Sequence, residues 1–123
     1  MHIDNLSSMC YYQFTSEVNP VRGGDVDITY KNNKIRKICT DPKTADRIYG
    51  KEMTGKIYQR INEIRAADCV EMMVQFHIGR CHRLTQNRRG QYAVDLIHPY
   101  RLVFEKVGDI VQIAVILEIV DYH

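Results

Sequence analysis

The chain has 123 residues, of which 45% are hydrophobic and 26% charged, and this size and composition fit one globular domain with a single core. No apolar run approaches the length of a membrane span, and the first residues lack the basic and apolar segments of a secretory signal, so a cytoplasmic protein is expected. The net charge of +2 is uneven: residues 31–106 hold sixteen Lys and Arg against eight Asp and Glu, which fits a polyanion-binding surface or an ordinary solvated face.

The first 24 residues predict an extension outside the domain. They show no clear hydrophobic period, and Gly23-Gly24 is typical of a hinge. The apolar patch from Met9 to Phe14 is suited to adding a strand to a sheet edge, but a poorly ordered terminus is the favoured interpretation. We therefore expect the domain to span 25–123 and to begin with a strand at 26–30, where apolar and polar residues alternate.

Helical signals follow this strand. Asn32 is a typical cap for a first helix, which Pro42 should end because the residue before a proline avoids the helical conformation. A second helical segment is expected over 44–49. The strongest helix is expected over about 52–67, where apolar residues recur at helical spacing, and a further turn near Met72 should cover the core.

The hydrophobic period changes to two after Gly79. Strands are expected near 80–84, 91–97, 100–106 and 111–121, with connections short enough for antiparallel neighbours. The order of strand, helices and sheet predicts an α+β fold, in which the N-terminal strand and the helices pack on an antiparallel-rich C-terminal sheet. The last strand should be central because it is almost continuously apolar.

The four cysteines, at positions 10, 39, 69 and 81, contain no C-x-x-C pair and are too few to define a disulfide framework. We expect reduced and mostly buried thiols. Cys81 and His82 are neighbours in a predicted strand, so their side chains should point to opposite faces and not share a zinc ion. No metal and no cofactor are expected.

Alternation along the strands suggests a candidate catalytic cleft. Asp121 and His123 should continue one row of the last strand, so a cleft rimmed by His82, Arg101 and His123 is geometrically allowed. Such a cleft suits RNA cleavage, in which one imidazole takes the proton of a 2′-hydroxyl and another protonates the leaving 5′-oxygen. Guanidiniums stabilise the charged phosphate, and Tyr122 can stack on a base.

The same residues also fit plainer roles. A terminal histidine such as His123 is more often frayed than functional, and His77 and His98 are expected to be structural or simply exposed. Arg88 and Arg89 fit a solvated turn.

Several segments, in their order and spacing, resemble the RelE/ParE superfamily of bacterial toxins, and within it the HigB branch of plasmid-maintenance killer proteins. The matching segments are 31–35, 64–68, 79–82, 89–96, 98–105 and 118–123. The resemblance implies a fold like that of microbial ribonucleases. It also implies metal-independent cleavage of messenger RNA in the ribosomal A site, by a toxin that inhibits translation.

The resemblance also implies site residues. Those that match the active-site cleft are His82, Arg101, Asp121, Tyr122 and His123, while Arg80, Arg83, Arg88 and Arg89 are the expected RNA and phosphate contacts. Which histidine is the base stays open. Thr85 departs from the branch, which often has a lysine there, and the 1–24 extension is atypical.

The implied partners are an antitoxin, of the helix-turn-helix HigA type, and the ribosome with its messenger RNA. Two alternatives stay open beside the ribonuclease. One is a non-enzymatic inhibitor of DNA gyrase like the ParE relatives, and the other is an inactive module that only binds an antitoxin. The oligomeric state is undetermined by the sequence.

Overall fold

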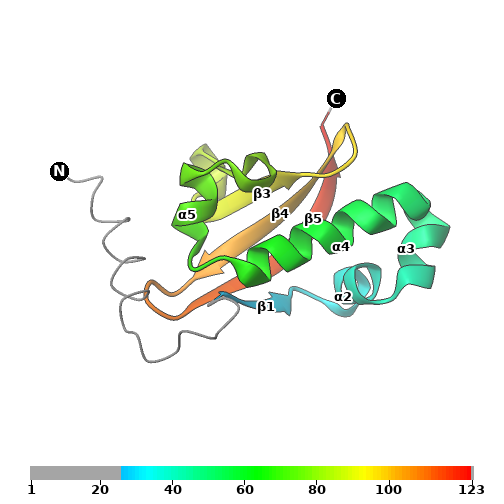
Figure 1. Ribbon diagram of the computed structural model, residues 1–123, viewed down its shortest axis with the longest axis horizontal. Helices are drawn as coiled ribbons and strands as arrows, with labels where there is room; N and C mark the ends of the chain where they lie inside the picture. The colour runs from blue at the N-terminus through cyan, green and yellow to red at the C-terminus, as the bar shows by residue number, and fades with distance from the viewer. Residues whose placement is uncertain (1–25, 123) are drawn as a thin grey trace.

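The computed structural model describes residues 26–122 and shows helices packed on one mixed sheet (Figure 1). In the described part the sheet has five strands in the order β1-β5-β4-β3-β2, with β1 parallel to β5 and the other neighbours antiparallel. The elements in chain order are β1 (Val26–Tyr30), α2 (Asn33–Thr40), α3 (Pro42–Tyr49), α4 (Lys51–Ala66), α5 (Val70–Gln75), η1 (Ile78–Arg80), β2 (His82–Arg83), η2 (Gln86–Arg88), β3 (Gln91–Asp95), β4 (Tyr100–Val107) and β5 (Gln112–Asp121). The predicted α+β class is confirmed. The predicted 1–24 extension lies outside the described residues.

The helix boundaries follow the capping residues. The side chain of Asn32 accepts a hydrogen bond from the backbone N–H of Ile35 at 3.0 Å, which satisfies a free donor at the start of α2. Asp41 ends α2 and caps α3, whose first residue is Pro42. Gly50, at a φ of +92°, separates α3 from α4. The breaks between the helices are therefore those the sequence predicts.

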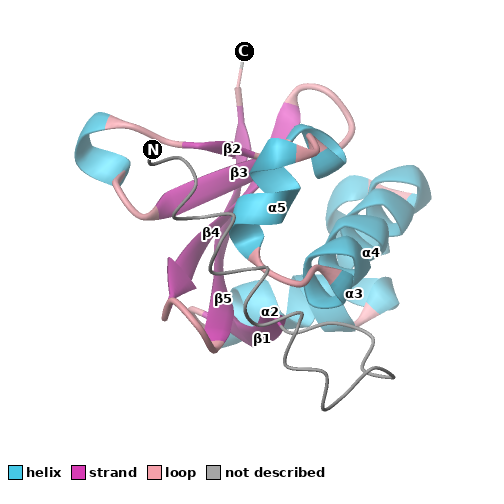
Figure 2. Cartoon of the chain, turned by 60° about the vertical axis from the view of Figure 1, so that its left-hand side comes forward, coloured by secondary structure: helices cyan, strands magenta, loops and turns pink. Residues whose placement is uncertain are grey.

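The core lies between the helices and one face of the sheet. Figure 2 shows α4 and α5 on the same side of the strands. The fully buried Ile57 and Ile64 of α4 belong to one cluster with Leu102 and Phe104 of β4 and Ile116 of β5. Burying side chains of this size contributes about 1.5–3 kcal/mol each, so the packing of α4 on β4 and β5 stabilises the domain.

The last strand contains a β-bulge that the sequence pattern does not reveal. Consecutive residues of β4 pair with Ile116 and Glu118, so Leu117 is an extra residue between them. The alternation shifts by one at this point. Ile119 packs against the core, whereas Ile113 lies on the other face. The single row predicted along this strand is therefore wrong, although β5 is paired on both sides, as expected.

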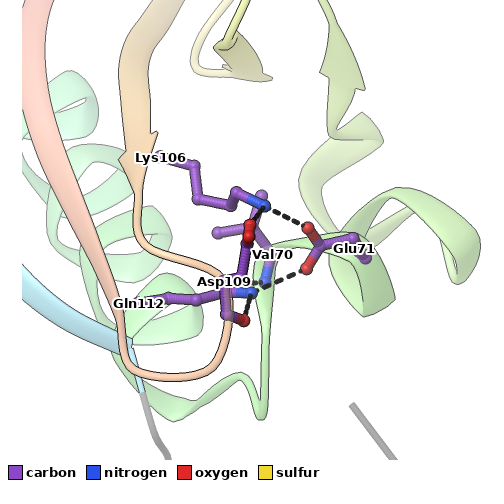
Figure 3. A network of polar contacts seen from close by, with 5 residues as sticks. All are labelled: Val70, Glu71, Lys106, Asp109 and Gln112. Carbon is purple, nitrogen blue, oxygen red and sulfur yellow. Dashed lines mark hydrogen bonds and ion pairs between the residues drawn. The ribbon is translucent and has the colours of Figure 1, made fainter. Parts of the chain in front are cut away.

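A buried polar network holds α5 against the β4–β5 hairpin (Figure 3). Gln112, which is 1% exposed, accepts a hydrogen bond from the backbone N–H of Val70 at 2.8 Å and donates one to Glu71 at 2.9 Å. Lys106 donates to the other carboxylate oxygen of Glu71, and Gln112 also donates to the carbonyl of Asp109. Each end of the buried carboxylate thus has a partner, which fixes the position of α5 and of the loop that follows it.

Two details differ from the sequence predictions. The strand predicted at 80–84 is only His82–Arg83, because the preceding residues form a tight 3₁₀ turn. Cys39 and Cys81 are buried free thiols, but Cys69 is disulfide-bonded, so the prediction of four reduced thiols is wrong for Cys69. The spacing of cysteines along a chain does not determine which of them meet in space.

No helix within residues 26–122 has the length and apolar character needed to cross a membrane.

Candidate functional site

A cleft of about 550 Å³ opens where β2 begins, between the loop after α5 and the first residues of β4. Its lining consists of Val74, His77, Arg80, Cys81, His82 and Arg101. Three of these residues, Arg80, His82 and Arg101, are among those predicted from the sequence, and they come from η1, β2 and β4. Segments far apart in the chain therefore bring two imidazoles and two guanidiniums to one cleft.

The two guanidiniums of the cleft share one carboxylate. Arg80 Nε lies 2.9 Å from one oxygen of Asp95, and Arg101 Nε lies 3.3 Å from the other. Neither Arg80 nor Arg101 makes a hydrogen bond through its terminal nitrogens to a residue in 26–122. Two positive charges against one negative charge leave an excess that attracts an anion, and the uncommitted N–H groups can donate to it.

Sequence reasoning missed Asp95, which the fold makes the centre of this arrangement. It is the last residue of β3 and pairs in register with Arg101 of β4. Arg60 of α4 donates through Nε to the backbone carbonyl of Asp95 at 2.6 Å, which ties the end of the strand to the long helix. Asp95 occupies a polar position of a predicted strand, but its partners appear only once the β3–β4 register is known.

His82 has a defined tautomer in its neutral form. Its Nδ1 lies 3.0 Å from the backbone carbonyl of Arg80, and a carbonyl can only accept a hydrogen bond. The contact is a hydrogen bond only in the tautomer with its proton on Nδ1, and that tautomer leaves the lone pair on Nε2. An imidazole held in this way can accept a proton at Nε2, as a general base requires.

The described end of the chain lies beside this cleft. Tyr122 donates its backbone N–H to the carbonyl of Pro99 at 2.9 Å, and the guanidinium carbon of Arg101 lies 4.6 Å from the centre of the Tyr122 ring. Figure 1 shows the C-terminal end of β5 next to the loop that joins β3 and β4. A cation–π contact of this kind orients both groups. Asp121 pairs with Tyr100 and is exposed, and the predicted site residue His123 lies outside the described residues.

The loop that carries the cleft has an unusual backbone. His77 has φ 56° and ψ 35°, and Arg80 has φ 55°, both in the left-handed region that non-glycine residues seldom adopt. Gly79, at φ 60°, lies between them. Backbone strain of about 1–3 kcal/mol per residue persists only where the surrounding structure imposes it, and it is concentrated at functional sites.

The other predicted phosphate contacts do not join this cleft. Arg88 forms an ion pair with Glu118 of β5. Arg83 and Arg89 line a separate cavity of about 680 Å³, together with Thr85 and Lys106. His82 and Arg83 separate because successive residues of a strand point to opposite faces. The basic residues near the β2 edge thus divide into one set in the cleft and another behind it.

Within the described part of the chain, no three His, Cys, Asp or Glu side chains are grouped so that they could hold a metal ion.

No protein-family model matches the chain, and no curated protein matches it significantly in sequence. Among solved structures, the chain is similar to a YoeB/ParE toxin from Agrobacterium tumefaciens. The TM-score is 0.56 at 11% sequence identity, and the match covers 79% of this chain and 99% of the other. The two proteins therefore share a fold across nearly the whole length of that toxin, and at this identity the likeness establishes the fold alone.

Proposed function

We propose that the protein is the toxin of a toxin–antitoxin pair and that it acts as a ribosome-dependent messenger RNA endonuclease. The observation that carries the proposal is the cleft, in which His82 presents a free Nε2 beside the guanidiniums of Arg80 and Arg101. The shared fold with a YoeB/ParE toxin supports the toxin role. The segment resemblance to the HigB branch supports the endonuclease.

The proposed reaction needs a base, an acid and a group that stabilises negative charge. His82 takes the proton of a 2′-hydroxyl at Nε2, and the resulting oxygen attacks the adjacent phosphorus. The terminal N–H groups of Arg101 and Arg80 donate to the phosphate oxygens as charge builds up on them, and loss of one such donor costs about 3 kcal/mol in comparable sites. No metal ion takes part in this scheme.

Tyr122 and its neighbours would position the RNA. The Tyr122 side chain is 36% exposed, so one ring face can stack on an unpaired base while Arg101 contacts the ring. By the family resemblance, Asp121 and His123 join this end of the cleft. Arg83, Arg88 and Arg89 would then contact phosphates on either side of the cleavage point.

The proposed partners follow from the same charges. A cleft with surplus guanidinium charge suits messenger RNA held in the ribosome, and it also suits an acidic segment of an antitoxin that blocks it. We propose a helix-turn-helix antitoxin of the HigA type and a cytoplasmic site of action.

The test is cleavage of a messenger RNA programmed in the ribosomal A site, measured for wild type and for His82→Asn and Arg101→Ala. Each variant should cleave at least about 100-fold more slowly. The matched control is His98→Asn, since His98 is exposed and is not part of the cleft lining. Wild-type rates in the two cleft variants would refute the proposal.

The gyrase-inhibitor alternative has one observation in its favour, because the similar structure is described as a YoeB/ParE toxin and both names belong to one fold. A supercoiling assay with purified gyrase separates the two functions. Inhibition of supercoiling that persists in the His82→Asn variant, without RNA cleavage by wild type, would favour the inhibitor. The inactive-module alternative expects no RNA cleavage by wild type. Thr85 favours it, because the resembling branch often has a lysine there and Thr85 lines the same cavity as the proposed phosphate contacts Arg83 and Arg89.

A further inference from the structure

We propose that His77 is the second proton-transfer group of the cleft and acts as the general acid that protonates the leaving 5′-oxygen. This inference rests on the proposed endonuclease activity. The sequence interpretation gave His77 no function, and the family resemblance does not include it. The structure, however, makes it the other imidazole of the cleft lining, alongside His82 and Arg101.

The His77 ring is available for such a role. The residue is exposed, and its ring makes no hydrogen bond or ion pair with any residue in the described part of the chain. Here both ring nitrogens are left to exchange protons with solvent or substrate.

The backbone of His77 has a conformation that few non-glycine residues adopt. At φ 56° and ψ 35° it is in the left-handed conformation, which glycine and asparagine adopt more readily. The chain turns tightly here: His77 N donates to Val74 O at 3.2 Å, and Arg80 N donates to His77 O at 3.0 Å. This turn brings His77, Arg80 and His82, which lie within six residues of one another, to one cleft.

The surroundings hold this turn in place from two sides. On one side, Gln112 accepts from Val70 N and donates to Glu71, which fixes α5 just before the turn (Figure 3). On the other side, the turn passes close to Arg60, because a Cβ placed on Gly79 would lie 3.0 Å from the Arg60 side chain. A catalytic group needs this kind of support, since a displacement of about 1 Å is costly in rate.

Apart from Arg60, which lies close to Gly79 of the turn, the titratable and charged groups near His77 are those of the cleft. They are Arg80 on η1, His82 on β2 and Arg101 on β4, with the Asp95 carboxylate of β3 between the two guanidiniums and the buried Cys81 thiol in the lining. Nearby Phe76, the residue before His77, is 58% exposed and offers an aromatic face for a base. The group beside His77 that can bind a phosphate is therefore the arginine pair.

The proton balance closes with two imidazoles. Neutral His82 accepts the 2′-hydroxyl proton at Nε2, a bond forms between the 2′-oxygen and phosphorus, and the bond from phosphorus to the 5′-oxygen breaks. Protonated His77 gives its proton to that 5′-oxygen. The products are a 2′,3′-cyclic phosphate and a 5′-hydroxyl, with His82 protonated and His77 neutral, and exchange with water restores both.

The experiment compares His77→Asn, His82→Asn, His123→Asn and the control His98→Asn in single-turnover cleavage of ribosome-bound messenger RNA. Asparagine tolerates the left-handed backbone but transfers no proton near neutral pH. His77→Gly is the second variant, because glycine adopts this conformation without strain and serves if the asparagine variant does not fold. We expect His77→Asn to lower the rate about 100-fold or more and leave the half-saturating ribosome concentration unchanged.

A modified substrate assigns the role. When sulfur replaces the 5′-oxygen at the cleavage point, the leaving thiolate needs no proton, so the His77→Asn rate should return to within about threefold of wild type. The His82→Asn rate should not recover. Wild-type rates for His77→Asn, or sulfur rescue of His123→Asn in place of His77→Asn, would overturn the inference and leave the endonuclease intact. A wild-type protein that cleaves no ribosome-bound RNA would overturn both.

Discussion

The buried pair of Lys106 and Glu71 offers the sharpest test of how the domain is stabilised. Their side chains are 15% and 5% exposed, and Gln112 occupies the second carboxylate oxygen of Glu71. Lys106→Met keeps the aliphatic stem but leaves the carboxylate without a positive partner. Removing one member of a buried ion pair costs about 3–5 kcal/mol, a large part of the 5–15 kcal/mol typical of a domain.

Lys51→Met is the matched control. Lys51 also pairs with a carboxylate, that of Asp46 at 3.3 Å, but the Lys51 side chain is 90% exposed. Such a pair contributes at most about 1 kcal/mol because water screens it. The free energy of unfolding of each variant is measured from urea titrations of the full chain. We expect a clear loss for Lys106→Met and almost none for Lys51→Met.

The double variant Glu71→Leu/Lys106→Met tests whether the loss in Lys106→Met comes from the unpaired buried charge of Glu71. Replacing a buried ion pair by apolar residues of similar size is often neutral, so this variant should regain most of the stability lost in Lys106→Met. Equal losses for Lys106→Met and Lys51→Met would refute the reasoning, because the network would then contribute no more than a surface contact.

Three further predictions concern pH, the turn and the basic residues behind the cleft. Burial alone would raise the pKa of Glu71, but hydrogen bonds from Lys106 and Gln112 outweigh it and hold this pKa below its ordinary value. The stability that this lowered pKa provides is present above the unfolded-state pKa of Glu71 and is lost as pH falls through the lower folded-state pKa. When the free energy of unfolding is measured against pH, its decrease at acidic pH should therefore be smaller for Glu71→Gln than for wild type. Gly79→Ala should lower the free energy of unfolding, measured by urea titration, by about 1–2 kcal/mol, because alanine is strained at φ 60° and its Cβ would crowd Arg60. Gly55→Ala is the control and should not destabilise the domain, since the space around Gly55 is open. Finally, the double variant Arg83→Gln/Arg89→Gln should lower the slope of log binding constant against log salt concentration for RNA by about one unit per residue. The cleavage rate of bound RNA should stay unchanged. An unaltered slope would exclude phosphate contacts at these two residues.

The sequence predicts the local structure well because its signals are local. Asn32 and Gly50 bound helices where expected, and the apolar spacing from Met53 to Ile64 finds the long helix. The bulge at Leu117 escapes prediction because residues 113–117 are all apolar, so both faces of the strand are apolar there. An extra residue in a continuous apolar run changes no pattern in the sequence, yet it moves Asp121 to the other face.

Only part of the candidate site is predictable from the sequence, because some of its residues are brought together by contacts between distant segments. His82 and Arg101 carry chemistry that alone suggests a cleft, and the fold brings them together. Asp95 and His77 gain their significance from pairings that the sequence does not encode locally: the register between β3 and β4, and a left-handed turn after α5. Arg83 is predicted as a phosphate contact from the sequence, and alternation along β2 places it in the separate cavity, away from its neighbour His82.

Asp95 explains how the cleft can hold two cations without a ligand. Guanidiniums that line one cleft repel each other, and the carboxylate between Arg80 and Arg101 offsets that repulsion while occupying only their Nε groups. The terminal nitrogens then remain for a phosphate. Because α4 holds the Asp95 carbonyl through Arg60, the orientation of both arginines depends on the core packing of that helix. Chemistry at the sheet edge is in this way supported by the most buried contacts of the fold.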